Sequence, residues 1–188
     1  MNTAILYAPI ARYLLAAALS WSPLAAHDYT RVARADTQAR YESIVADLET
    51  VALDPFEDPL FEGPTGRAQT ALLMLAIASY ESGGFRADVD QQDHPSGDGG
   101  HAWCLAQLHD EAPSHYARGL TDRVSCFRGM LHALRDSWSM CVTDGWDPAY
   151  RITGYTVGHC ELDEPQAKHR LERAMRWWAM APWLPPVS

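Results

Sequence analysis

The feature that most constrains the fold is an unbroken run of eight apolar residues, Ala71 to Ala78. As a helix, this run is apolar on every face, so the rest of the protein has to cover it on all sides. It is far too short to cross a lipid bilayer, which takes about 20 residues. Thr65 or Gly66 can begin the helix, and Gly83-Gly84 can end it. The sequence therefore predicts one central, buried helix.

Further helices are needed to cover this one, and the sequence predicts several. From Asp36 to the Asp54-Pro55 boundary, apolar residues recur at steps of three and four, which is typical of an amphipathic helix. The same pattern predicts helices over about 122–141, over 147–158 and from 163 through 178. Clear alternation of apolar and polar residues is absent. We therefore expect a mainly α fold, with at most a small hairpin or irregular segment within residues 85–107.

Length and charge restrict the class of protein. A chain of 188 residues, 47% of them hydrophobic, is expected to form one domain with one core. Its 15 Lys and Arg against 24 Asp and Glu give a net charge of −9, the opposite of what binding to phosphates requires. No nucleic-acid partner is expected. Residues 85–101 are rich in Asp, Gly, Gln and Pro and predict a long loop, and such loops often carry function.

The first 35 residues form an apolar segment that we separate from a domain over residues 36–188. Residues 13–19 are an apolar run after Arg12, and Leu24-Ala25-Ala26 is similar to the small-residue site at which signal peptides are cleaved. Two interpretations stay open: an imperfect signal peptide, or a retained helix packed on the domain. The apolar run is too short to span a bilayer, so no stable membrane span is expected.

Four cysteines lie in the second half of the chain: Cys104, Cys126, Cys141 and Cys160. None of them is spaced as Cys-x-x-Cys, and zinc sites usually need such close pairs, so neither a metal nor a cofactor is expected. The even number favours two disulfides, with all three pairings open, over four buried thiols. Disulfides persist in oxidising compartments, so we expect a protein that acts outside the cytoplasm.

Glu81 is the residue most suited to chemistry. It ends the central helix, and the eleven residues before it carry no charge. The negative end of the helix dipole and an apolar neighbourhood both raise the pKa of a carboxyl group, as a general acid working near neutral pH requires. The alternative is a glutamate that points into solvent at the end of a helix.

Three short segments then follow one another along the chain: Glu81-Ser82-Gly83-Gly84, residues 97–107 (GDGGHAWCLAQ), and Gly154-Tyr155-Thr156-Val157-Gly158. Together they resemble motifs of the superfamily of lytic transglycosylases and goose-type lysozymes. Its members carry a catalytic Glu-Ser pair, then Gly-Ala-x-Gly-Leu-x-Gln, and later Ala-Tyr-Asn-x-Gly. The resemblance spans residues 78–158 and implies a lysozyme-like single domain with a long active-site loop.

The resemblance also implies a role for each matching residue. Glu81 would be the general acid and base, and Ser82 its neighbour at the substrate. Gln107 would line the substrate groove, and Tyr155 would orient the acid or the substrate. Trp103 lies within the second segment, where its ring could stack on a sugar face.

Two positions depart from the family's pattern. Cys104 stands where the family has Gly, and Thr156 stands where it commonly has Asn. The cysteine suggests a disulfide that tethers the loop, and we expect one bridge to use Cys104 and another to use Cys160. The threonine removes an amide from the expected substrate contact beside Tyr155.

Glycoside cleavage needs an acid for the leaving oxygen and a group that satisfies the oxocarbenium-like centre. In lytic transglycosylases the C6 hydroxyl of N-acetylmuramic acid attacks internally, so one carboxylate serves as acid and then as base. A goose-type lysozyme would instead use a second carboxylate to hold water. The loop after Glu81 offers Asp88, Asp90, Asp93 and Asp98, and we single out Asp90 and Asp98.

The resemblance thus implies an enzyme that cleaves the β-1,4 bond between N-acetylmuramic acid and N-acetylglucosamine in peptidoglycan. A lytic transglycosylase is the preferred form, of bacterial or phage origin, acting in the periplasm, as a secreted protein, from a phage virion, or in phage lysis. The alternative is a non-catalytic, lysozyme-like module that binds glycan or neighbouring proteins in a virion or envelope assembly.

Overall fold

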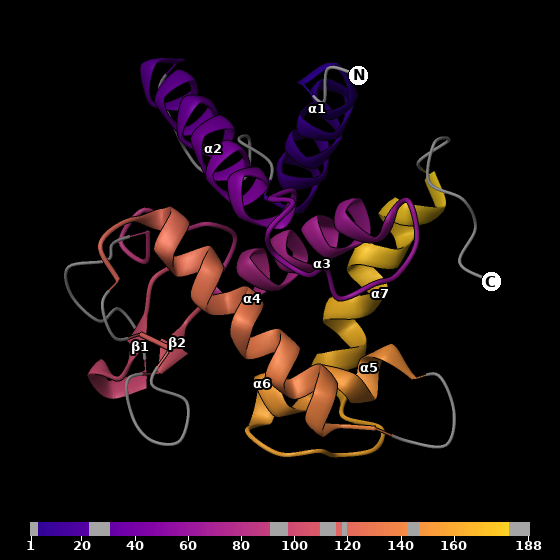
Figure 1. Cartoon of the computed structure of the whole chain (residues 1–188). Helices are drawn as coiled ribbons and strands as arrows, with labels where there is room; N and C mark the ends of the chain where they lie inside the picture. Colours follow the sequence, from indigo (N-terminus) through magenta and orange to yellow (C-terminus); the bar gives the residue numbers. More distant parts are fainter. Residues whose placement is uncertain are drawn as a thin grey trace.

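The computed structural model describes residues 4–22, 31–90, 98–109, 116–117, 120–142 and 147–180. These residues form seven α-helices and one two-stranded sheet (Figure 1), which confirms the mainly α class. The helices are α1 (Ala4–Trp21), α2 (Arg31–Ala52), α3 (Gly66–Glu81), α4 (Arg123–Met140), α5 (Pro148–Arg151), α6 (Thr153–Val157) and α7 (Pro165–Met180). The strands are β1 (Ala102–Trp103) and β2 (Leu108–His109), and a short 3-10 turn at Asp98–Gly100 precedes them.

Helix α3 is the buried centre of the fold. Every residue from Gly66 to Ser79 except Arg67 is buried. In Figure 1 this helix crosses the middle of the molecule, with α1 and α2 on one side and α4 and α7 on the other, and all four pack against it. The helix begins at Gly66 and ends just before Gly83-Gly84, so the predicted central helix is confirmed.

The long covering helices also follow their sequence signals. Helix α2 begins at Arg31 rather than at Asp36. The start of α4 is fixed by a capping box, in which the Asp122 carboxylate accepts from the Ser125 N–H and the Ser125 hydroxyl accepts from the Asp122 N–H. At the start of α7, the buried Glu164 carboxylate accepts a hydrogen bond from the Ala167 N–H.

The helix expected over residues 147–158 is two short helices instead, α5 and α6, which meet at Ile152. Ser137 of α4 explains why the break is tolerated. Its hydroxyl donates to the Arg151 carbonyl at 2.8 Å and accepts from the Tyr155 N–H at 3.0 Å, so two backbone groups near the break keep partners. Gly158 ends α6 in the left-handed conformation, at φ 80°.

The small sheet is an antiparallel hairpin in which Ala102 pairs with His109 and Trp103 with Leu108. The sequence predicts at most a small hairpin or an irregular segment within residues 85–107, and the second strand of the observed hairpin lies just beyond that range. Period-two alternation cannot mark strands of two residues, because such strands are too short to show it.

Helix α1 packs on the domain rather than standing apart from it. Leu14, Ala17 and Ala18 are buried, and α1 packs against both α2 and α3. The expected boundary after residue 35 falls inside α2, and the cleavage-like Leu24-Ala25-Ala26 lies outside the described residues. Within the described ranges, no helix has the length and apolar character needed to cross a membrane.

Glu49 of α2 predicts a pH dependence of stability. Its Oε1 atom is buried without a hydrogen-bond partner in the described structure, and burial raises the pKa of this carboxyl to about 7. Because the pKa rises on folding, the group favours the folded state below its ordinary pKa of 4.5, and this stability is lost as pH rises towards 7.

Replacing Glu49 with Gln removes this titration. After a discount for the partly exposed side chain, we expect the unfolding free energy of the variant, relative to that of the parent, to rise by about 1–2 kcal/mol between pH 4.5 and pH 8. Urea unfolding at both pH values measures the gain, with Glu42→Gln, an exposed glutamate of the same helix, as the control. An equal difference from the parent at the two pH values would contradict the prediction.

Candidate functional site

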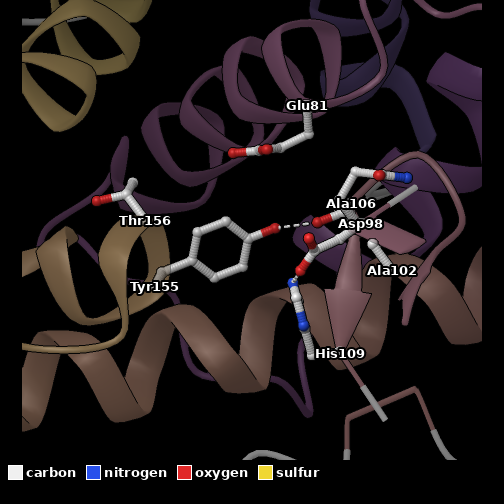
Figure 2. Close-up of a pocket in the computed structure, with 8 residues that line it drawn as sticks. Glu81, Asp98, Ala102, Ala106, His109, Tyr155 and Thr156 are labelled. Atoms are coloured by element: carbon white, nitrogen blue, oxygen red, sulfur yellow. Dashed lines mark hydrogen bonds and ion pairs between the residues drawn. The ribbon is translucent and has the colours of Figure 1, made fainter. Parts of the chain in front are cut away.

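A pocket of about 210 Å³ lies where the end of α3, the hairpin region and α6 come together. Figure 2 shows the side chains converging on it from these three segments. The residues that line it are Glu81, Asp98, Ala102, Ala106, Gln107, His109, Tyr155 and Thr156. Each of the three sequence motifs contributes at least one of these residues.

The backbone turn after Glu81 is held from inside the protein. Ser82 is buried, and its hydroxyl donates to the Ala78 carbonyl at 2.6 Å and accepts from the Phe85 N–H at 2.8 Å. Gly83 and Gly84 follow at φ 61° and 89°, a region that side chains disfavour. Ser82 therefore shapes the turn and does not line the pocket.

The same turn is tied to the two N-terminal helices. The Gly84 carbonyl accepts hydrogen bonds from the Ser22 hydroxyl at 2.8 Å and from the Tyr41 hydroxyl at 3.2 Å. Tyr41 also donates to Ser22 at 2.8 Å. The position of Glu81 thus depends on residues at the end of α1 and in the middle of α2.

Glu81 points into the pocket but is largely buried, with 18% of its side chain exposed. Its Oε1 atom lies 2.5 Å from Nη2 of Arg170, an arginine of α7 whose side chain is only 2% exposed. Burial raises the pKa of Glu81, while the charges of Arg170 and His109 act against the rise. The raised pKa agrees in direction with the sequence prediction, and the solvent-directed alternative is wrong.

Tyr155 of α6 lies beside Glu81 and joins two walls of the pocket. Its hydroxyl donates to the Ala106 carbonyl at 2.5 Å (Figure 2). Burial raises the pKa of the Tyr155 phenol well above its ordinary value, and the Glu81 charge raises it further. Tyr155 therefore keeps its proton and acts as a hydrogen-bond donor at the pocket wall.

Gln107 and Trp103 occupy different positions. Gln107 lines the pocket, and its Nε2 donates to the Cys104 carbonyl at 2.9 Å. Trp103 is not among the lining residues; its ring packs against the hydrophobic core, and its buried Nε1 has no hydrogen-bond partner within the described structure. The structure thus brings Gln107, but not Trp103, to Glu81.

The two aspartates singled out from sequence have separate environments. Asp98 is 71% exposed and lines the pocket, with its Oδ2 3.6 Å from Nε2 of His109. Asp90 is 2% exposed and lies outside the pocket lining, where it pairs with Arg40 at 3.3 Å and Arg123 at 2.8 Å. Asp98 is therefore the carboxylate that shares the pocket with Glu81.

The other two aspartates of this loop add nothing to the pocket. Asp88 is exposed and pairs with Arg86, and Asp93 lies outside the described residues.

Two residues at the site were given no role from the sequence, His109 and Arg170. His109 faces the pocket. The feature that could have revealed it is its position two residues after Gln107, in the strand that pairs with Ala102. Arg170 contacts Glu81 from 89 residues away and had no local signal, because α7 shows only an ordinary amphipathic pattern.

Two disulfides hold the pocket walls onto α4. Cys104 pairs with Cys126 and Cys141 pairs with Cys160, which confirms that one bridge uses Cys104 and another uses Cys160. The first tethers the segment with Ala106 and Gln107, and the second tethers the end of α6.

Nowhere in the described residues do three His, Cys, Asp or Glu side chains gather as they would around a metal ion.

The placement of Asp90 predicts a structural effect that Asp98 lacks. Asp90→Ala leaves Arg40 and Arg123 without their shared carboxylate, so we expect the free energy of unfolding to fall by about 2–4 kcal/mol. Asp98→Ala, at an exposed position, should change it by less than about 0.5 kcal/mol. Chemical denaturation of both variants checks this, and similar losses in the two would contradict the assignment.

Each disulfide should stabilise the fold by restricting the unfolded chain. Cys141 and Cys160 are 19 residues apart, and closing such a loop contributes about 3 kcal/mol. We therefore expect the Cys141→Ala/Cys160→Ala double variant to melt at a lower temperature than the parent, and the parent to melt lower with reductant than without. Equal melting of the parent under both conditions would show that the bridges do not stabilise it.

Comparison with protein-family models, with curated proteins and with solved structures finds no match to this chain. The interpretation of the pocket therefore rests on its own geometry and on the motif resemblance. That geometry consists of a buried carboxyl with a raised pKa, an arginine behind it, and an exposed Asp98–His109 pair in the same pocket.

Proposed function

We propose that this protein cleaves peptidoglycan glycan strands between N-acetylmuramic acid and N-acetylglucosamine, as a lytic transglycosylase with Glu81 as general acid and base. The observation that carries the proposal is the convergence of three motif segments, far apart in sequence, on one pocket around Glu81. Glu81 ends a helix without any other charge in its last three turns, and burial raises its pKa. A carboxyl with a raised pKa is better suited to donate a proton than an ordinary surface glutamate.

The reaction follows from one carboxyl group. Glu81 protonates the glycosidic oxygen as its bond to C1 of N-acetylmuramic acid breaks, and the released sugar leaves with a new hydroxyl. The C6 hydroxyl of the same N-acetylmuramic acid then attacks C1 and returns its proton to the Glu81 carboxylate. The product ends in a 1,6-anhydro ring, and Glu81 regains its starting state.

Asp98 and His109 support a variant of this reaction. If the pocket retains a water molecule beside Asp98, water attacks C1 in place of the C6 hydroxyl, and the product has a reducing end as in a lysozyme. The acid step by Glu81 is the same in both cases. The chemical nature of the product end therefore distinguishes a transglycosylase from a hydrolase.

The two disulfides support a location outside the cytoplasm, because reducing compartments rarely keep such bonds. Peptidoglycan lies in the same environment. We accordingly place the proposed enzyme in the periplasm or envelope of a bacterium, in its secretions, or in a phage virion that digests the wall on entry.

The ion pair of Glu81 with Arg170 favours a second candidate. A buried pair that links α3 to α7 can serve structure alone, and the protein would then be a lysozyme-like module that binds glycan or neighbouring virion or envelope proteins. The two candidates differ in whether the protein releases fragments from peptidoglycan.

Digestion of purified peptidoglycan, with mass spectrometry of the released muropeptides, tests the proposal. We expect anhydro-ended fragments from the parent and a loss of at least about 100-fold in Glu81→Gln, because the amide cannot donate the proton. Gln still offers an oxygen to Arg170, so the variant should fold, which thermal melting checks.

Glu172→Gln, at an exposed glutamate of α7, is the matched control and should retain parent activity. Reducing ends would indicate a hydrolase, in which case Asp98→Asn should also lower the rate. Binding to peptidoglycan without release by the parent would favour the second candidate, and full activity in Glu81→Gln would refute the role of Glu81.

A further inference from the structure

Arg170 is a fully enclosed cation with an unusual set of contacts. Its side chain is 2% exposed, and its Nη2 atom is 2.5 Å from Oε1 of Glu81. Both terminal nitrogens also lie 3.4 Å from Oε1 of Gln166, one turn earlier in α7. The plane of the guanidinium is flanked by Tyr80, whose ring centroid is 4.2 Å from Cζ. These contacts hold the guanidinium in one place behind Glu81.

The arginine reaches only one oxygen of the carboxyl group. In the described residues no group donates a hydrogen bond to Oε2 of Glu81, and the side chain lines the pocket while Arg170 does not. The Nε atom of Arg170 is itself buried without a partner. An arginine placed to form the strongest structural pair would use two nitrogens on two oxygens, and this one does not.

We propose that Arg170 is a positioning residue for Glu81: it binds one carboxyl oxygen, fixes the rotamer of the side chain, and leaves the other oxygen to face a substrate in the pocket. This inference rests on the proposed function for its catalytic meaning, but the positioning itself can be measured without activity. Arg170 does not line the pocket, so it acts through residues that do: it binds Glu81 directly, and its charge also acts on Tyr155.

The charged and titratable groups that surround Glu81 come from three elements. They are Arg170 of α7, His109 of β2 and Tyr155 of α6, and Asp98 faces the same pocket beside His109. Arg170 is the largest charge opposing the effect of burial on the Glu81 pKa. Its removal should therefore favour the protonated carboxyl and move the alkaline limb of the activity profile to higher pH.

The test compares Arg170→Gln and Arg170→Lys with Arg173→Gln. Arg173 is the matched control, because it lies one turn further along α7 and donates to Ser79 at 3.1 Å instead of to Glu81. NMR of carboxyl-labelled glutamate, assigned with Glu81→Gln, reports the titration midpoint, and side-chain couplings report the Glu81 rotamer. Muropeptide release across pH reports kcat and KM.

For Arg170→Gln we expect the titration midpoint of Glu81 to be about one pH unit or more higher than in the parent. The Glu81 side-chain couplings should be averaged over several rotamers, and kcat should fall about 10- to 100-fold at unchanged KM. Arg170→Lys keeps the charge but loses the two terminal nitrogens of the guanidinium. The titration midpoint of Glu81 should therefore stay near the parent value, while kcat should fall by less than in Arg170→Gln. Arg173→Gln should match the parent in all three. If Arg170→Gln does not fold, the lysine variant still decides through its kcat and couplings.

Parent-like couplings and kcat in the folded Arg170 variants would overturn the proposal and leave the function of Glu81 standing. A parent that releases no muropeptides, together with averaged couplings in Arg170→Gln, would overturn the proposed function and leave the positioning role standing. A shifted midpoint with unchanged couplings and unchanged kcat would show an ion pair of purely structural value, and the positioning role would fall.

Discussion

The burial of α3 is the constraint on which the rest of the structure depends. A helix without a polar face has to be enclosed, and four other helices enclose it. Along the chain, a charged side chain is accommodated again only where this enclosure ends. Glu81 lies at that edge and is the first charged residue after Arg67. The unusual state of its carboxyl group is therefore a consequence of the way the core is built.

Two opposing effects set that state. Burial favours the protonated carboxyl, while Arg170 favours the ionised one. The proposed reaction needs both forms of this carboxyl, first the acid and then the base, and each of the two effects favours one of them. Arg170 therefore limits how far the pKa of the Glu81 carboxyl rises above that of an ordinary surface glutamate.

Most of the helices could be predicted from the sequence because helix periodicity and capping are local signals. The start of α4 at Asp122 and the end of α3 before Gly83 are examples. The pocket was only partly predictable, since a loop pattern does not reveal which way its side chains face. Asp90 and Asp98 looked equivalent in sequence, yet one pairs with arginines and the other lines the pocket. Arg170 depends on the packing of α3 against α7, which no nearby residue encodes.

The two disulfides and the Tyr155–Ala106 hydrogen bond together close a ring. It runs from α4 through Cys126 and Cys104 to Ala106, across to Tyr155, and back through Cys160 and Cys141 to α4. All other links in this ring are covalent bonds, so the hydrogen bond from the Tyr155 hydroxyl is the only link in it that can break without a chemical reaction. Loss of this hydrogen bond would therefore leave both pocket walls anchored to α4 through their disulfides.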